Sequence, residues 1–143
     1  RNFAAINNCL LLKSLLMRKG TREAAGVTDS IVRGLFEKKG EKVALIDLRN
    51  IENRMCDWFV ISHASSSRQV DSLAWSVEDV VRKETGVKPF HIEGRENCIW
   101  VLLDYGDILV HIFQQPYRDF YDLESLWADG RITYLEDKIE KKG

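Results

Sequence analysis

The stretch WVLLDYGDILVHIF, residues 100–113, is the feature that most restricts the fold of this chain. Two apolar runs meet at the polar sequence DYGD, where Gly106 can adopt the positive φ that a tight turn between strands requires. In the first run both alternating faces are apolar; one face carries Ile99, Val101 and Leu103, and the other Trp100 and Leu102. A strand of this kind is covered on both sides, which requires layers above and below a sheet.

The rest of the chain alternates between helical and strand patterns. Apolar residues at helical spacing predict helices from Thr28 to about Gly40, from Ser66 or Ser67 to Gly86, and from about Pro116 to Gly130. Short apolar runs predict further strands over 42–48, 57–64 and 87–94. This order predicts an α/β (α+β) fold, a single layered domain whose mixed sheet of about five strands has helices packed on it.

Both ends of the chain differ from this pattern. Residues 1–26 form an N-terminal extension with no acidic residue before Glu23, and its apolar runs are too short to span a membrane. We expect this extension to be poorly ordered or loosely helical, with a transit peptide as the alternative. The domain is expected over residues 27–130, and the charged residues 131–143 are expected to form a surface tail.

Composition excludes several classes of protein. The 143 residues carry a formal net charge of −1, so nothing attracts the whole chain to nucleic acid, and no basic cluster is visible in the sequence of the domain. The three cysteines are far apart and show no CxxC spacing, which argues against a zinc site and a disulfide framework. Cys56 and Cys98 are expected to be partly buried thiols.

Catalytic signals are weak. Asp104 and Asp107 flank the predicted turn and could share a metal ion or a proton, but acidic residues also flank turns because they bind nearby backbone groups. The serines at 65–67 precede a helix without a phosphate-binding motif, so helix capping explains them. The three histidines, His63, His91 and His111, lie on predicted strands without the spacing of metal ligands, and packing is the favoured interpretation.

Large amphipathic aromatic side chains are numerous for a small domain: Trp58, Trp75, Trp100, Tyr105, Tyr117 and Tyr121. Side chains of this kind dominate the binding energy of many protein interfaces. We expect half or more of them to fill the core. The remainder would be available to a partner, which favours a binding function over chemistry.

Five motifs in order identify a resemblance to a known family: CDWFVI, SSRQV, GVKPFHIEG, WVLLDYGDILVHIF and RDFYDLESLWAD. Together, from about Thr28 to Asp129, they closely resemble the ribosomal silencing factor family, also called Iojap or RsfS. The resemblance implies a nucleotidyltransferase-like fold, a mixed sheet between helices, and a function that needs neither catalysis nor a cofactor. It implies binding to the large ribosomal subunit through its universal fourteenth protein, at the face that meets the small subunit, which blocks subunit joining and represses translation. It also implies a homodimer, with no membrane and no sequence-specific nucleic acid as partner.

The same resemblance implies a contact surface. Its members on this chain are Trp100, Leu102, Asp104 and Tyr105, with Lys88, Glu93 and Gly94 from the preceding strand and loop. Trp100 and Tyr105 would offer apolar anchors, while Asp104 and Glu93 would pair with basic groups of a ribosomal protein. Trp100 and Leu102 are expected on the exposed face of their strand, and Ile99, Val101 and Leu103 in the core. The strand would then be covered on both sides only in the complex.

Two other functions stay open at this point. A nucleotidyltransferase-type enzyme would need a Gly-Ser motif followed by Asp-x-Asp to hold metal ions, whereas HASSSRQ has no glycine and DYGD spaces its acids three apart. A dimeric adaptor with another partner is the second alternative. The expected location is the bacterial cytoplasm, or a mitochondrion or plastid if residues 1–26 are a transit peptide.

Overall fold

The computed structural model describes residues 21–137, so what was expected of residues 1–20 and 138–143 lies outside it. Its elements are, in chain order, α2 (Thr21–Glu37), β1 (Glu41–Asp47), β2 (Trp58–Ala64), α3 (Ser67–Thr85), β3 (His91–Glu93), β4 (Trp100–Asp104), β5 (Ile108–Gln114), α4 (Gln115–Tyr121), α5 (Leu123–Leu126) and β6 (Arg131–Tyr134). The α+β architecture predicted from the sequence is confirmed, with six strands instead of about five.

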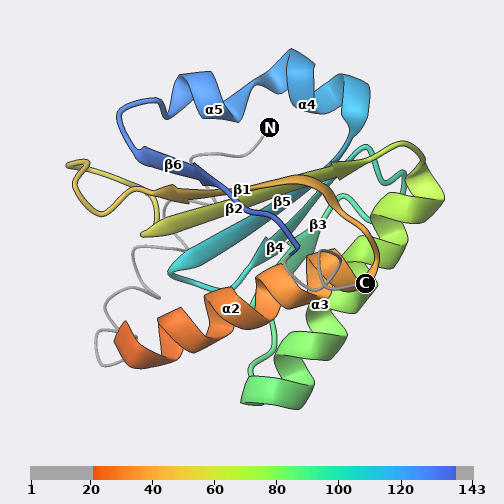
Figure 1. Cartoon of the computed structure of the whole chain (residues 1–143), viewed down its shortest axis with the longest axis horizontal. Coiled ribbons are helices and arrows are strands. Elements are labelled where there is room, and N and C mark those ends of the chain that lie inside the picture. Colours follow the sequence, from red (N-terminus) through yellow and green to blue (C-terminus); the bar gives the residue numbers. More distant parts are fainter. Residues whose placement is uncertain (1–20, 138–143) are drawn as a thin grey trace.

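One mixed sheet runs through the molecule in the order β3-β4-β5-β2-β1-β6 (Figure 1). β2 and β5 pair in parallel, and the other neighbouring strands pair antiparallel. The hairpin of β4 and β5 turns at Gly106, whose φ of 90° is the positive value predicted for this glycine. Because β3 pairs with β4 on one side and β2 pairs with β5 on the other, this hairpin lies inside the sheet and not at its edge.

Helices cover both faces of the sheet (Figure 1). α2 and α3 pack on one face, over a core that contains Val101, Leu103 and Val110. α4 and α5 lie over the other face, where Leu102, Leu109 and Leu123 are buried. β4 is thus covered on both sides within the single chain, as its apolar pattern predicts, although Trp100 at its start remains partly exposed.

The serines before α3 have the predicted capping role. The Ser66 side chain accepts a hydrogen bond from the Gln69 backbone nitrogen at 3.1 Å, and Gly86 ends the helix in the left-handed conformation with φ of 77°. Both ends of α3 are therefore fixed by the residues that the sequence indicated.

The two ends of the domain differ from expectation. α2 begins at Thr21, seven residues before the predicted start at Thr28. Residues 131–134 form β6 and pair with β1, so the prediction of a surface tail from residue 131 is wrong for this segment. The single helix predicted between Pro116 and Gly130 is divided into α4 and α5 at Asp122, which adopts φ of 45°.

Candidate partner-binding surface around Trp100

Trp100 is the centre of an aromatic cluster at the start of β4. It pairs in register with Phe113 of β5, and the two rings stack with centroids 5.0 Å apart. The Trp100 Nε1–H donates a hydrogen bond to His111 Nδ1 at 3.1 Å, and the Tyr121 ring of α4 lies 4.7 Å away. These contacts hold the indole in a fixed orientation. The indole is also partly exposed, so one part of it remains accessible.

His111 supports this indole from the interior. It is buried, and its ring meets the edge of Phe59 with centroids 4.6 Å apart. Burial lowers the pKa of His111 from its usual 6.5 to about 3. Since Nδ1 accepts the bond from Trp100, the neutral ring carries its proton on Nε2, which has no hydrogen-bond partner among the described residues.

The short helices α4 and α5 extend the cluster toward solvent. Tyr121 is partly exposed, and the neighbouring Phe120 is 77% exposed and meets Tyr121 edge to face at 5.2 Å. Leu126 on α5 is 64% exposed. Aromatic and aliphatic side chains are therefore presented to solvent by the same pair of helices that covers Trp100.

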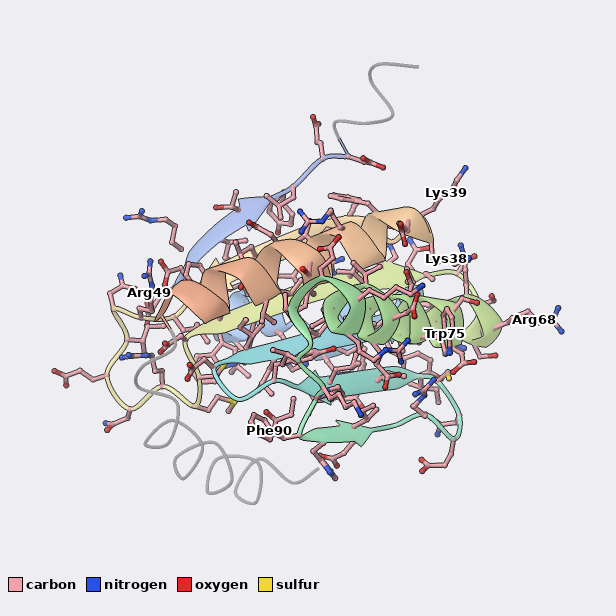
Figure 2. The ribbon with its side chains drawn as sticks, turned by 90° about the horizontal axis from the view of Figure 1, so that it is seen from below. Lys38, Lys39, Arg49, Arg68, Trp75 and Phe90 are labelled. Carbon is pink, nitrogen blue, oxygen red and sulfur yellow. The ribbon has the colours of Figure 1, made fainter. Side chains whose placement is uncertain are left out.

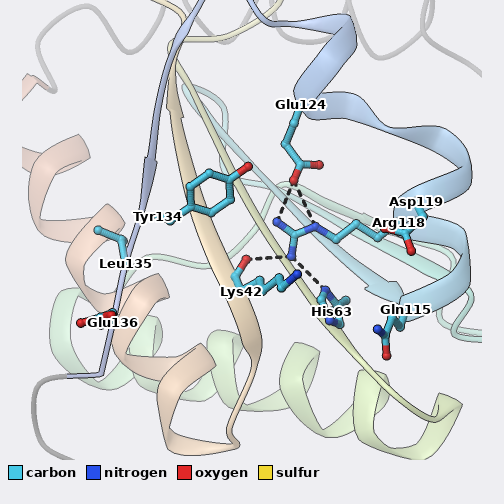
Figure 3. A pocket seen from close by; sticks show the side chains of 9 residues that line it. All are labelled: Lys42, His63, Gln115, Arg118, Asp119, Glu124, Tyr134, Leu135 and Glu136. Carbon is cyan, nitrogen blue, oxygen red and sulfur yellow. Dashed lines mark hydrogen bonds and ion pairs between the residues drawn. The ribbon is translucent and has the colours of Figure 1, made fainter. Parts of the chain in front are cut away.

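Arg118 fixes these helices to the sheet (Figure 3). Its guanidinium donates hydrogen bonds to the Lys42 carbonyl at 2.7 Å and to the Glu124 carboxylate at 2.9 Å, joining α4 to β1 and α5. The Arg118 side chain is only 5% exposed, and Glu124 is 18% exposed. A buried cation with several partners determines the position of α4 far better than the apolar contacts of a two-turn helix would.

The same arginine borders a cavity of about 570 Å³, lined by Lys42, His63, Gln115, Arg118, Asp119, Glu124, Tyr134, Leu135 and Glu136 (Figure 3). His63 Nδ1 accepts from Arg118 Nη1 at 3.0 Å. Burial, followed by the positive charge of Arg118, lowers the pKa of His63. The polar groups nearest to Arg118 thus form hydrogen bonds with it, and these bonds hold α4 and α5 on the sheet at this cavity.

The predicted contact residues separate by face. Trp100, Leu102 and Asp104 point to the α4–α5 side of β4, and Glu93 of β3 pairs with Leu102, so it points to the same side. Leu102 is only 7% exposed, so the expectation that it lies on an exposed face is wrong, because α4 and α5 cover it. Asp104 is also buried, and its Oδ1 accepts a hydrogen bond from the Gly106 nitrogen at 2.8 Å within the turn.

Tyr105 lies on the opposite side of the sheet from Trp100. It is buried in the core beneath α2 and α3, with 3% of its surface exposed. Burial, followed by the negative charge of Glu78, raises the pKa of its hydroxyl. The structure therefore does not place Tyr105 beside Trp100 as a second exposed anchor.

Gly94 and Lys88 complete the predicted set. Gly94 has φ of 89°, and a Cβ added there would lie 2.0 Å from the Trp100 carbonyl oxygen, so only glycine fits. Lys88 is exposed in the loop before β3. Gly94 thus positions the start of β4, whereas Lys88 and Glu93 are at the rim of the surface.

Other predicted features have simpler roles. Of the six large aromatics only Tyr105 is buried. Three are partly buried against the cores, Trp58, Trp100 and Tyr121, and two are exposed, Trp75 and Tyr117, so fewer of them fill the core than the sequence predicts. Cys56 and Cys98 are buried thiols, and burial raises the pKa of both. In residues 26–137 no three His, Cys, Asp or Glu side chains are placed to hold a metal ion. No helix in this range has the length and apolar character to cross a membrane.

Sequence reasoning missed three residues of this surface. The sequence predicts His111 only as a packing residue, and it assigns no individual role to Phe120 or Arg118. The alternation of β5 puts His111 and Phe113 on the same face, which is a signal for their contact with a tryptophan on the neighbouring strand. Arg118 gives no such signal, because its partners on the sheet, the Lys42 carbonyl and His63, lie 76 and 55 residues away in sequence.

Known proteins resemble this chain over most of its length. A family model described as ribosomal silencing factor during starvation matches residues 21–143. The ribosomal silencing factor of Halalkalibacterium halodurans is 36% identical over 76% of this chain and 91% of its own length, and that of Bacillus subtilis is 34% identical over 70% and 83%. The chloroplastic protein Iojap of Arabidopsis thaliana is 35% identical over 59% of this chain and 36% of its own length.

Solved structures agree with the sequence relatives. A crystal structure of a protein from Bacillus halodurans superimposes with a TM-score of 0.62 at 33% identity, covering 77% of this chain and 96% of the other. One from Chromobacterium violaceum gives a TM-score of 0.66 at 32% identity, covering 78% and 91%. The fold, the five motifs and the extent of these matches show that this chain belongs to the ribosomal silencing factor family.

Proposed function

We propose that this protein, as a silencing factor, binds the large ribosomal subunit through its universal fourteenth protein, at the face that meets the small subunit. Occupation of this face blocks subunit joining and lowers translation. The protein acts by steric exclusion and needs no catalytic group or cofactor. Its relatives include bacterial proteins and chloroplastic proteins, so the ribosome concerned is that of the compartment in which this chain occurs.

The observation that carries this proposal is the fixed, partly exposed indole of Trp100. A side chain held by a hydrogen bond and two ring contacts loses little conformational freedom when a partner binds it. Tryptophan and tyrosine are also the residues on which interface energy concentrates. Trp100, Tyr121 and Phe120 therefore form the apolar centre of the proposed contact, with Glu93 and Lys88 at its polar rim.

The other residues of the contact surface implied by the family resemblance are not placed to touch a partner, and they support the surface from the interior. Leu102 fills the core under α4 and α5, and Asp104 fixes the turn that carries the hairpin. Gly94 lets the β3–β4 connection approach Trp100, and Tyr105 anchors the far side of the sheet. In this proposal these four residues maintain the shape of the contact surface, and Trp100 makes the contact.

Co-sedimentation with isolated ribosomal subunits tests the proposal. The protein should pellet with large subunits and not with small ones, and Trp100→Ala should weaken this binding about 30-fold, as expected for loss of about 2 kcal/mol at a central anchor. Tyr134→Ala is the matched control, because Tyr134 is a 59% exposed aromatic on β6 at the opposite edge of the sheet. Equal loss in both variants, or no binding of the unaltered protein, would reject the proposed site.

We also propose that the protein forms a homodimer, as the family resemblance implies. Light scattering coupled to size exclusion should give about twice the mass of one chain. A monomer mass across the concentration range used for ribosome binding would contradict this part of the proposal.

A further inference from the structure

An exposed tryptophan on α3 lies among cations without acidic partners. Trp75 is 57% exposed, although its neighbours Leu73 and Ala74 are fully buried. Three exposed cations lie in the same region, Lys38, Lys39 and Arg68, and none of their side chains has a hydrogen bond or ion pair with another side chain in residues 26–137. The exposed Asp71 lies one helical turn before Trp75. We call Trp75, Lys38, Lys39 and Arg68 the Trp75 patch.

The close packing of α2 on α3 brings the two lysines to this position. The Ser76 hydroxyl donates to the Gly34 carbonyl at 2.7 Å, and a Cβ at Gly40 would lie 3.3 Å from Leu73 Cδ2. The segment between these two glycines, which contains both lysines, therefore passes over the middle of α3. A sequence separation of more than thirty residues concealed this cluster from sequence analysis.

Arg68 is on the same helix as Trp75 and seven residues before it. Seven residues are close to two helical turns, so the two side chains lie on the same face, about 10 Å apart along the axis. Figure 2 shows Arg68, Trp75, Lys38 and Lys39 at one end of the molecule, with Phe90 and Arg49 away from them.

Most arginines of the domain have an acidic partner. Six of them contact a carboxylate: Arg33, Arg49, Arg54, Arg82, Arg95 and Arg118. Three acids on α3 near Trp75 are already engaged, since Asp71 and Glu78 share Arg95, and Asp79 pairs with Arg82 and Lys83. Glu37 is the exposed acid next to Lys38 in sequence. The positive charge of the Trp75 patch is thus largely uncompensated in a chain whose net charge is −1.

We propose that the Trp75 patch binds single-stranded RNA without sequence preference. A base would stack on the exposed Trp75 ring, and the three cations would contact phosphates. This combination of an aromatic platform with flanking cations is how proteins bind single strands of any sequence, because every base has a π-face and every nucleotide a phosphate. A membrane surface would require more apolar area than one indole, and an acidic peptide would not require the indole.

This surface is separate from the one proposed for the ribosomal protein. Trp75 lies on the α2–α3 layer, whereas Trp100 faces the α4–α5 layer on the other side of the sheet (Figure 1). The inference therefore does not rest on the proposed function. The two surfaces can be occupied together, which would let the factor hold an RNA segment while it is docked.

Fluorescence anisotropy with a labelled twelve-nucleotide oligouridylate and an oligoadenylate tests the inference. Both RNAs should bind, and log K should fall with log salt with a slope of about −2, from about 0.7 for each of three phosphate contacts. Trp75→Ala should weaken binding about tenfold at every salt concentration, and Trp75→Phe should recover most of this loss.

Charge variants separate the patch from the charge of the whole chain. The triple variant Lys38→Gln, Lys39→Gln, Arg68→Gln should reduce the salt slope nearly to zero. The matched control Arg33→Gln, Arg49→Gln, Arg54→Gln removes the same charge from arginines that pair with acids and lie outside α3, and it should keep the slope. Circular dichroism verifies that each variant folds.

Three results would overturn the inference. One is no binding of either oligonucleotide at 50 mM salt, a condition that favours phosphate contacts. Another is equal loss of binding in the two triple variants. The third is binding to anionic phosphatidylglycerol vesicles that is tighter than RNA binding and unaffected by Trp75→Ala. Binding to large ribosomal subunits is measured in parallel, so failure here leaves the proposed function to its own test.

Discussion

His111 makes a direct prediction about pH. Its pKa is lowered by burial to about 3 in the folded protein, whereas an unfolded histidine titrates near 6.5. The unfolded state therefore binds a proton in this interval and the folded state does not. The contribution of His111 to the free energy of unfolding should therefore be complete above about pH 6.5. Below this pH the free energy of unfolding should fall by about 1.4 kcal/mol per pH unit for this one proton. His63, whose pKa is also lowered, adds to the slope.

Urea unfolding between pH 6.5 and 5 measures this slope before most carboxylates titrate. His111→Phe should lower the slope by about one proton, even though it leaves the Trp100 N–H without its acceptor. Phe113→Leu disturbs the same ring cluster but keeps the histidine, so it should retain the original slope. An unchanged slope in His111→Phe would show that His111 is not the buried neutral group described here.

Gly94 predicts a stability difference between two glycines with positive φ. Gly94→Ala should destabilise the protein by about 2–3 kcal/mol, because its Cβ would lie 2.0 Å from the Trp100 carbonyl oxygen. Gly86→Ala should cost about 1 kcal/mol, since φ of 77° is strained for alanine but no atom lies within 4 Å of the added Cβ. Chemical denaturation of both variants measures the two losses of stability. Equal losses would contradict the close approach of Gly94 to the Trp100 carbonyl oxygen.

Exposure of single residues was the least predictable property at this scale. Alternation predicts which residues of β4 share a face, and Val101 and Leu103 are in the core as expected. Ile99 precedes β4 and is only half-buried, so its place in the core is not confirmed. It could not predict that Leu102 is covered, because this depends on where α4 and α5 pack, which is a tertiary property. Tyr105 illustrates the same limit, since its parity with Val101 indicates the opposite face from Trp100, but the family resemblance grouped it with Trp100.

At the scale of elements, α4 and α5 depend on Arg118. Arg118→Met should destabilise the protein by about 3–5 kcal/mol, because Glu124 and the Lys42 carbonyl lose a partner in a site that is largely closed to water. Arg82→Met breaks an ion pair whose arginine is 53% exposed, so it should cost less than about 1 kcal/mol.

A double-mutant cycle isolates the pair of Arg118 and Glu124. The variant Arg118→Met, Glu124→Leu should be at least about 1 kcal/mol more stable than the sum of the single effects predicts, since neither charge is left without the other. Strict additivity would indicate that the arginine acts through the carbonyls of β1 alone.

The division between α4 and α5 was not predictable from periodicity. Phe120, Leu123, Leu126 and Trp127 follow helical spacing, which predicts one continuous helix. Asp122 interrupts it by adopting the left-handed conformation, in which it ends α4 and its side chain caps α5 at the Ser125 nitrogen. Aspartate tolerates this conformation better than most residues, so the residue type allows the interruption, but the apolar spacing gives no sign of it.

At the scale of the whole molecule, the order of elements was predictable and their pairing was not. The sequence places β1 next to β2 and β4 next to β5, and both pairs are neighbours in the sheet. The parallel pairing of β2 with β5 joins segments fifty residues apart, because α3 leads from β2 to β3 at the edge of the sheet and the chain returns through β4 to β5. The sequence does not predict β6, because the four residues RITY show no apolar pattern. Only Ile132 is half-buried in this strand.

The layered fold gives the molecule two chemically different sides. The α4–α5 side exposes aromatic and aliphatic groups around Trp100, and the α2–α3 side carries the Trp75 patch. A sheet covered on both faces separates these sides, so a substitution on one should leave the other unchanged. This separation allows the protein contact and the RNA contact to be tested independently.

The most direct test of the central claim is a subunit-joining assay. Purified small and large subunits are mixed with magnesium, and the joined fraction is measured on a sucrose gradient with increasing amounts of the protein. The account predicts that the joined fraction falls as the protein saturates the large subunit, and that Trp100→Ala requires about 30-fold more protein for the same effect. Undiminished joining at saturating protein, or equal inhibition by Trp100→Ala, would contradict it.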